Sequence, residues 1–178
     1  MDKAAIRAEK RALREALGAE RPVLSVPAPF RALLAPGMVV ASYIPVRGEA
    51  DPAPLAQAAA EVGCTIALPH VVDRATPLRF LAWQTEQALV AGPFGLRQPV
   101  DHADELAPDL ILTPLVAFDR ALGRLGQGAG YYDRAFVRFP DARRIGVALS
   151  IQEVPHVPTD PWDVPLHVII TENEWITP

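Results

Sequence analysis

Cysteine and lysine are both scarce in this chain of 178 residues. Cys64 is the only cysteine, which excludes an internal disulfide bond and fits a protein of the reducing cytosol. It stands at the start of an apolar run, so we expect a small buried side chain with no catalytic role. Lys3 and Lys10 are the only lysines, and arginine supplies every other permanently positive side chain.

The chain also lacks an excess of positive charge and any long apolar segment. Its formal net charge is −4 at pH 7, so an anion site must be a local basic patch on an acidic body. A membrane-spanning helix requires a run of about eighteen apolar residues, and no such run occurs. The charged N-terminus also lacks the apolar core of a signal peptide. We therefore expect a cytoplasmic monomer that binds neither nucleic acid nor membrane.

Several familiar catalytic patterns are missing as well. No Lys-Ser or Lys-Thr follows the glycine-rich segment, so a P-loop is excluded, and no acid lies about twenty residues beyond it to hold a ribose. No Ser-His-Asp or Cys-His nucleophile pattern is evident. The histidines lack the spacing of metal ligands, and we expect all four to be structural: His70, His102, His156 and His167.

The residues that are present follow the pattern of an α/β protein. Half are apolar and 21% are charged, which suits one globular domain over residues 1–178. The nineteen prolines fall at element boundaries rather than in one tract. Helical patterns cover residues 2–17 (ended by Gly18), 28–35, 52–62 (capped by Asp51) and 131–139. Strand patterns cover residues 38–44, 65–68, 78–83, 110–113, 144–149 and 168–171.

This alternation predicts an open, mostly parallel sheet with helices on both faces, because several of the strands are apolar throughout. Ligands of such sheets bind at the carboxyl ends of the strands. The segments after predicted strands are residues 45–51, 69–73, 114–133 and the turn after Leu149. The candidate functional residues gather in the first and third of these segments.

The most informative segment is GRLGQGAGYYDR at residues 123–134, with four glycines in eight positions. Successive peptide N–H groups of such a loop form a concave anion site, and a helix starting at Tyr131 adds about half a positive charge. Arg124 and Arg134 supply fork-shaped donors for phosphate, and Asp133 is a candidate magnesium ligand. An ordinary glycine-rich surface turn is the alternative; the flanking residues favour a nucleotide-phosphate site.

The N-terminal helical pattern carries Lys3, Arg7, Arg11 and Arg14 on one face. Two interpretations stay open from spacing alone. The first is a solvated amphipathic helix whose arginines pair with its own glutamates, and the second is an electrostatic funnel for an anion. The apolar stripe of this helix is thin, so we expect it to lie over the domain rather than inside it.

Several segments together resemble the 5-formyltetrahydrofolate cyclo-ligase family, also called 5,10-methenyltetrahydrofolate synthetases, from Lys3 to Thr171. The resemblance implies an α/β fold akin to the sugar-phosphate isomerase and CoA-transferase (NagB/RpiA/CoA-transferase-like) group. It also implies ATP- and Mg²⁺-dependent conversion of 5-formyltetrahydrofolate to 5,10-methenyltetrahydrofolate. The matching segments are Lys3-x-x-x-Arg7, Tyr43-Ile44-Pro45 with Glu49-x-Asp51, Ala67-Leu68-Pro69, residues 114–119 and 123–134, Trp162-Asp163 and Ile169-Ile170-Thr171.

The resemblance also assigns roles to individual residues. Arg124 is the expected catalytic residue, clamping the transferred phosphoryl group, and Asp133 and Asp163 are the expected Mg²⁺ ligands. Expected substrate contacts are Glu49, Phe94, Tyr131 and Tyr132, with the Glu49 carboxylate accepting N–H bonds from the pterin. Core packing is the alternative for Phe94, and anchoring of the helix is the alternative for the two tyrosines. Expected ATP contacts are Lys3, Arg7, Arg124, Gly126, Gln127, Gly128, Ala129, Gly130, Tyr131 and Tyr132.

The sequence departs from the family pattern at two positions. Pro52 stands where the family commonly has threonine, within a helix start, and His167 stands where a third acid is usual. The change to His167 leaves open which residue completes the outer shell of the metal. Two other functions remain as alternatives: a sugar-phosphate isomerase or CoA-transferase-like enzyme, and a non-catalytic nucleotide- or folate-binding protein of the same fold.

Overall fold

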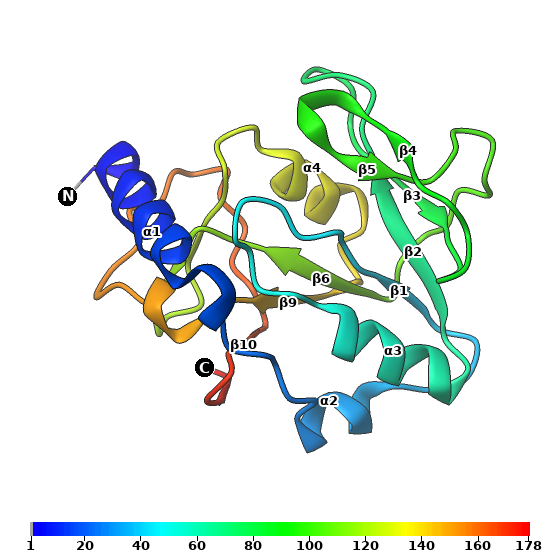
Figure 1. Ribbon diagram of the computed structural model, residues 1–178, viewed down its shortest axis with the longest axis horizontal. Helices are drawn as coiled ribbons and strands as arrows, with labels where there is room; N and C mark the ends of the chain where they lie inside the picture. Colours follow the sequence, from blue (N-terminus) through cyan, green and yellow to red (C-terminus); the bar gives the residue numbers. More distant parts are fainter. Residues whose placement is uncertain (1) are drawn as a thin grey trace.

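The computed structural model describes residues 2–178, and its centre is a mixed sheet of seven strands (Figure 1). From edge to edge the order is β11-β10-β9-β6-β1-β2-β3. Five adjacent strands from β10 to β2 run parallel, and the antiparallel strands β11 and β3 form the edges. The bounds are β1 Val39–Ala41, β2 Thr65–His70, β3 Arg79–Ala82, β6 Leu110–Pro114, β9 Arg143–Val147, β10 Val168–Ile170 and β11 Trp175–Ile176. The predicted open, mostly parallel α/β sheet is confirmed.

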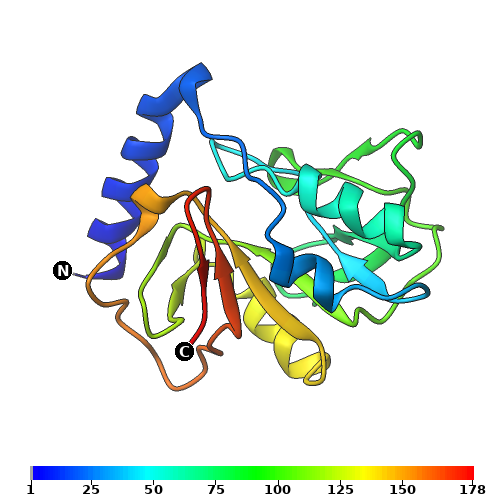
Figure 2. The same ribbon diagram turned by 90° about the horizontal axis from the view of Figure 1, so that it is seen from below.

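Helices cover both faces of this sheet, α2 and α3 on one side and α4 on the other (Figures 1 and 2). Val40 of β1 packs in one buried cluster with Phe30 of α2 and Leu55 of α3. Its neighbour Ala41 points to the opposite face and packs in a second cluster with Phe136 of α4. The apolar strand residues are thus buried on both sides, as parallel strands require. The helices are α1 Lys3–Leu17, α2 Ala28–Leu33, α3 Ala53–Val62 and α4 Tyr131–Arg138.

Helix α1 lies beside the sheet, at the end to which the parallel strands point (Figure 1). Asp2 caps its start by accepting a hydrogen bond from the N–H of Ala5 (2.8 Å), and Gly18 ends it with φ of 50°. Ile6 is buried and packs with Leu125 beyond β6. The prediction that this helix lies over the domain is confirmed. Within residues 2–178, none of the helices is both long enough and apolar enough to cross a membrane.

The shortest elements of the structure have no signal in the sequence. Two separate hairpins, the edge strand β11 and three 3₁₀ turns were not predicted, because a strand of two residues shows no periodicity. The predicted strand over residues 38–44 is shortened to β1, and α3 begins at Ala53, although Asp51 does accept a hydrogen bond from the Ala53 N–H (2.9 Å). The additional elements are β4 Val90–Ala91, β5 Arg97–Gln98, β7 Ala117–Phe118, β8 Arg124–Leu125, η1 Gly18–Glu20, η2 Pro93–Gly95 and η3 Ser150–Gln152.

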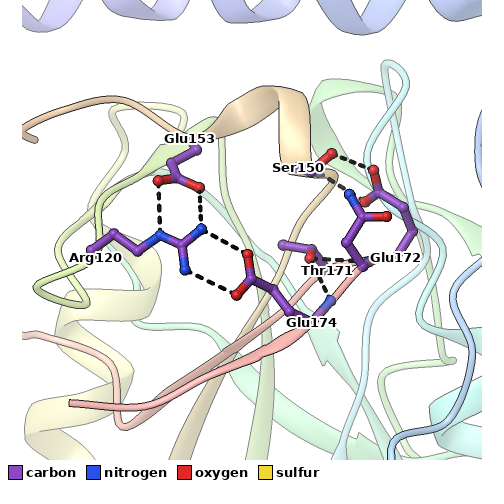
Figure 3. A network of polar contacts seen from close by, with 7 residues as sticks. Arg120, Ser150, Glu153, Thr171, Glu172 and Glu174 are labelled. Atoms are coloured by element: carbon purple, nitrogen blue, oxygen red, sulfur yellow. Dashed lines mark hydrogen bonds and ion pairs between the residues drawn. The ribbon is translucent and has the colours of Figure 1, made fainter.

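Arg120 connects three loops at the carboxyl end of the sheet (Figure 3). Its guanidinium forms paired bonds with Glu153 (2.8 and 3.0 Å) and with Glu174 (2.9 and 2.7 Å). Beside this network, Glu172 accepts hydrogen bonds from the hydroxyl and the N–H of Ser150. Exposed ion pairs contribute little to stability singly, but bidentate pairs in a network hold loop geometry. The β7–β8 turn, η3 and the β10–β11 turn are therefore fixed relative to one another.

A second loop anchor is Asp119, a buried carboxylate (3% exposed) at the end of β7. Its Oδ1 accepts hydrogen bonds from the N–H groups of Ala121 (3.1 Å) and Gly123 (2.9 Å), and its Oδ2 accepts one from Val157 (2.7 Å). A Cβ at position 123 would lie 2.9 Å from Oδ1, so glycine is required there for the close approach. Asp119 thus shapes the turn that leads into the glycine-rich segment.

We expect Asp119→Ala to lower the free energy of unfolding by about 3 kcal/mol, because it leaves three peptide N–H groups without their acceptor. Urea denaturation followed by circular dichroism measures this change. The matched control is Asp141→Ala on the exposed surface, which should stay within about 0.5 kcal/mol of the unsubstituted protein. Equal stability of the two variants would contradict the role given to Asp119.

Candidate active site

The strand order reverses between β1 and β6, and this position defines the site. From β1 the chain continues through α3 to β2 on one side, whereas β6 pairs on the other side of β1. The connections that leave the carboxyl ends of these two neighbours therefore diverge, and in open α/β sheets the crevice for the ligand lies at such a position. Residues 42–51 follow β1 and residues 115–130 follow β6. Two of the predicted functional segments are thereby brought together.

The glycine-rich segment divides into a hairpin and a loop. Arg124 and Leu125 form β8 and pair with β7, so the first part is strand rather than the predicted loop. The remaining loop, residues 126–130, ends at Gly130, the N-cap of α4. Gly128 and Gly130 have φ of 107° and 68°, a backbone region that glycine adopts without penalty. The prediction that the loop leads into a helix N-terminus is confirmed.

The loop exposes a row of hydrogen-bond donors. Within residues 2–178, the peptide N–H groups of residues 126–130 donate to no other part of the protein. The positive end of α4 lies directly behind them. Such a row of free donors at a helix N-terminus is suited to a phosphate chain.

The basic face of α1 lies against this loop. The Arg7 Nε donates to the carbonyl oxygen of Gly126 (2.8 Å), and its guanidinium lies next to Gly128. The Arg11 guanidinium bonds the side-chain oxygen of Gln127 (2.6 Å). The alternative of a helix whose arginines pair mainly with its own glutamates is therefore wrong for these two side chains. Segments more than a hundred residues apart in the sequence meet here.

Lys3 and Arg124 pair with the two aspartates predicted as metal ligands. The Lys3 ammonium lies 2.7 Å from Asp163 Oδ2 and 2.6 Å from Asp160 Oδ2. Arg124 lies 2.6 Å from Asp133 Oδ1, and its guanidinium stacks on the ring of Phe136. Burial opposes the charge on Lys3, but the two carboxylates outweigh it and raise the pKa of its ammonium.

Asp133 and Asp163 are held near each other, because the N–H of Val164 donates to Asp133 Oδ1 (3.3 Å). Asp133 Oδ2 and Asp163 Oδ1 accept no hydrogen bond within residues 2–178. Groups of three or more Asp, Glu, His or Cys that could hold a metal are absent from this part of the chain. Mg²⁺ commonly takes one or two carboxylates, with waters and substrate phosphates completing its shell, so the pair fits a nucleotide-bound Mg²⁺.

His167, which replaces the usual third acid, takes no part in this pair. Its Nδ1 accepts the N–H of Arg144 (3.0 Å), and its Nε2 lies 2.9 Å from the Arg144 guanidinium. Burial and the neighbouring arginine lower its pKa, so the ring is neutral near pH 7. The structural role predicted for His167 agrees with these contacts.

Glu49 is the buried acid of the site (4% exposed), in the loop after β1. Its Oε2 accepts the N–H of Val46 (3.1 Å), and its Oε1 accepts the side-chain N–H of Gln127 (3.2 Å). Burial raises the pKa of Glu49 despite these bonds. Gln127 thus connects the carboxylate on the β1 side of the crevice to the glycine loop on the β6 side.

Arg14 is fully buried, which corrects the expectation that it belongs to an exposed electrostatic funnel. Its NH1 donates to the carbonyl oxygen of Leu115 (3.2 Å), while its Nε and NH2 have no hydrogen-bond partner within residues 2–178. Its charge counteracts the effect of burial on the pKa of Glu49. Spacing placed Arg14 on the same helix face as Lys3 and Arg7, but spacing alone gives no information on depth.

The two tyrosines take different positions. The Tyr131 hydroxyl donates to the carbonyl oxygen of Asp73 (2.7 Å), so this ring anchors α4 to the loop after β2. Tyr132 packs against Phe136, and burial followed by the charge of Glu49 raises the pKa of its phenol. The phenol of Tyr132 therefore belongs to the surroundings of Glu49.

Phe94 lies outside the hydrogen-bonded set around Glu49. Its ring is 54% exposed on the turn between β4 and β5, and the Arg74 guanidinium lies over it. The carbonyl oxygen of Arg74 in turn accepts a bond from Arg134 (3.1 Å). The core-packing alternative for Phe94 is therefore wrong, and contact with substrate stays a prediction.

Comparisons with known proteins identify the family. The model of the 5-formyltetrahydrofolate cyclo-ligase family matches residues 3–172. The 5-formyltetrahydrofolate cyclo-ligase of Escherichia coli (strain K12) is 32% identical over 146 residues, covering 76% of this chain and 80% of the relative. That of Mycolicibacterium smegmatis is 32% identical over 148 residues, covering 79% and 76%.

Solved structures give the same result. The 5,10-methenyltetrahydrofolate synthetase of Aquifex aeolicus has a TM-score of 0.79 at 29% identity, over 99% of this chain and 93% of that one. The synthetase of Mycoplasma pneumoniae has a TM-score of 0.68 at 22% identity, over 97% and 99%, and supports the fold. The family match spans nearly the whole chain, so this protein belongs to the 5-formyltetrahydrofolate cyclo-ligase family.

Proposed function

We propose that this protein converts 5-formyltetrahydrofolate to 5,10-methenyltetrahydrofolate, with hydrolysis of ATP to ADP and phosphate. The observation that carries the proposal is the side chain of Gln127. It joins the glycine loop, which Arg7 and Arg11 contact, to Glu49, the buried acid of the same crevice. A phosphate-type site and a site for a polar heterocycle therefore adjoin, as transfer of a phosphoryl group to folate requires.

The chemistry explains why ATP is needed. The oxygen of a formyl group that is attached to nitrogen is a poor leaving group, so ring closure requires conversion of this oxygen to a phosphate ester. The γ-phosphoryl group passes from ATP to the formyl oxygen, and N10 of the folate then attacks the formyl carbon. Loss of the N10 proton and departure of phosphate with the formyl oxygen leave the methenyl bridge. No side-chain nucleophile is needed, and catalysis depends on positioning and charge neutralisation.

We assign the nucleotide to the loop of residues 126–130 and the cations around it. The free peptide N–H groups hold the phosphate chain at the N-terminus of α4. Arg7 and Lys3 approach from α1, and Arg124 clamps the transferred group from β8. Within residues 2–178 the Arg124 guanidinium forms one hydrogen bond, from NH2 to Asp133, so it keeps further donors free while it pairs with that acid.

Asp133 and Asp163 are the residues that would hold Mg²⁺, each through the oxygen that accepts no hydrogen bond. When bound, the ion neutralises phosphate charge during transfer. Asp133 would hold it beside the glycine loop, since this residue lies in the first turn of α4.

Glu49 is assigned to the pterin. An ionised carboxylate accepts two N–H bonds, the pattern that an aminopyrimidinone presents. The charge of Arg14 favours the ionised form, and Gln127 and Val46 hold the orientation of the carboxylate. We assign Tyr132 to the same side of the crevice because its phenol lies within the field of Glu49.

The residues of the site come from both ends of the chain, which supports residues 1–178 acting as one domain. Lys3 and Asp163 are separated by 160 positions and bond directly. Truncation of either end would remove a residue assigned to the nucleotide site.

Absorbance of the methenyl product tests the proposed reaction directly. Purified protein with 5-formyltetrahydrofolate, ATP and Mg²⁺ should show a gain in that absorbance, and omission of ATP should abolish it. Calorimetry distinguishes the remaining alternative, since a binding protein without activity would bind ATP and release no phosphate. ATP binding without turnover would exclude the enzymatic proposal.

A further inference from the structure

The carboxylate of Asp163 is already occupied by a cation of the protein itself. Lys3 Nζ lies 2.7 Å from Asp163 Oδ2 and 2.6 Å from Asp160 Oδ2, so two aspartates share one ammonium. The side chains of Lys3 and Asp163 are 24% and 20% exposed, which weakens screening by water. The cation assigned to phosphate and the acid assigned to the metal therefore neutralise each other.

We propose that the Lys3 ammonium is a built-in stand-in for the metal at Asp163, and that binding of magnesium nucleotide transfers it from Asp163 to phosphate while Asp160 keeps it tethered. This inference rests on the proposed function. It makes Asp160 a positioning residue for Lys3, a role separate from the metal ligands. It also predicts that metal and nucleotide bind synergistically.

Charge balance gives the physical reason. Mg²⁺ alone must displace Lys3 from Asp163 and leave that ammonium with fewer partners. Nucleotide alone must draw Lys3 away and leave the partly buried Asp163 without its counter-ion, which is unfavourable. When both bind, each released group gains a partner of opposite charge. The two ligands therefore favour each other's binding by the same factor, as thermodynamic linkage demands.

The surroundings allow Lys3 to move while the helix stays in place. Helix α1 is held to the loop by Arg7 and Arg11, and its start is capped by Asp2. The aspartate turn is also fixed without Lys3, because the N–H of Asp160 donates to Asp163 Oδ2 (2.8 Å) and the N–H of Asp163 donates to the Asp160 carbonyl oxygen (3.0 Å). The flexible lysine side chain is thus the movable part.

Arg124 differs from Lys3 in this respect. Its guanidinium is buried, stacked on Phe136 and bonded to Asp133. Because its NH1 forms no hydrogen bond within residues 2–178, it can gain phosphate contacts and keep Asp133. The exchange is therefore assigned to Lys3.

Calorimetric titration of Lys3→Met tests the inference, with Mg²⁺ alone and with Mg²⁺ plus a non-hydrolysable ATP analogue. Removal of the competing ammonium should strengthen binding of Mg²⁺ alone by about fivefold, the scale of one partly exposed ion pair. The same change should weaken binding of the magnesium nucleotide by about fivefold or more. Lys3→Arg keeps the charge and should stay within about twofold of the unsubstituted protein for Mg²⁺ alone.

Opposite signs for the two ligands are the decisive result. A Lys3→Met variant whose affinity for Mg²⁺ alone is unchanged or weaker would overturn the inference. Lys3→Gln, a second neutral variant, decides the case if Lys3→Met fails to fold by circular dichroism. Turnover by the unsubstituted protein together with unchanged Mg²⁺ binding by the variants would reject the exchange and leave the proposed reaction standing.

Discussion

Arg124→Ala should lower kcat by about a thousandfold, the scale of an arginine that neutralises a transferred phosphoryl group. The guanidinium is buried, stacked on Phe136 and fixed by Asp133, so it is pre-organised beside the glycine loop. Its loss removes charge stabilisation that acts chiefly during transfer, and KM for 5-formyltetrahydrofolate should therefore change little. Steady-state kinetics of product formation measure both constants.

Arg124→Lys is the matched control for this prediction. Lysine keeps the positive charge but loses the planar fork, so we expect activity between those of the alanine variant and the unsubstituted protein. Circular dichroism and thermal unfolding check that the fold survives, because Asp133 loses its partner in the alanine variant. An unchanged kcat in a folded Arg124→Ala protein would remove this residue from the mechanism.

Glu49→Gln should raise KM for 5-formyltetrahydrofolate by about a hundredfold. The neutral amide replaces an acceptor-only carboxylate, and charge-assisted bonds contribute about 1.5–3 kcal/mol each. The affinity for ATP should change little, because the nucleotide loop keeps its contacts with Arg7 and Arg11. KM values for the two substrates, measured separately, check this split; an equal rise in both would contradict the assignment to the pterin.

Stability provides the control, and its sign follows from burial. The folded-state pKa of Glu49 lies above its unfolded value, so its favourable contribution is present below the unfolded pKa and lost as pH rises through the folded pKa. At pH 7 the ionised group is therefore a cost to folding, and Glu49→Gln should match or exceed the unsubstituted protein in Tm. Glu61→Gln, on the exposed surface of α3, should change neither Tm nor KM.

Local signals in the sequence account for the parts of the fold that were predicted correctly. Apolar runs separated by helical patterns indicated a mostly parallel sheet, and Gly18 ends α1 as predicted. Glycines before an amphipathic segment indicated a loop leading into α4. Each of these signals acts over a few residues, so it is readable without knowledge of the partners.

The composition of the site depended on contacts that no local pattern contains. Spacing assigned Arg14 to the same helix face as Arg7, yet one is fully buried and the other bonds the glycine loop. Asp119 lies in the matching segment 114–119 but was given no role, although it organises the turn before that loop through Gly123 and Val157. Burial and the choice of hydrogen-bond partners depend on which strands are neighbours. The periodicity of the sequence carries no information on strand order.

By itself the sequence determined the family, the class of fold and the residue types that suit phosphate and a pterin. Only the tertiary structure decided that Lys3 bonds Asp163, that Glu49 bonds Gln127, and that Arg14 is fully buried. The physical reason is the distance along the sequence over which each signal acts. Capping and periodicity act within about four residues, whereas the packing of α1 against the loops at the carboxyl end of the sheet joins segments up to 160 positions apart.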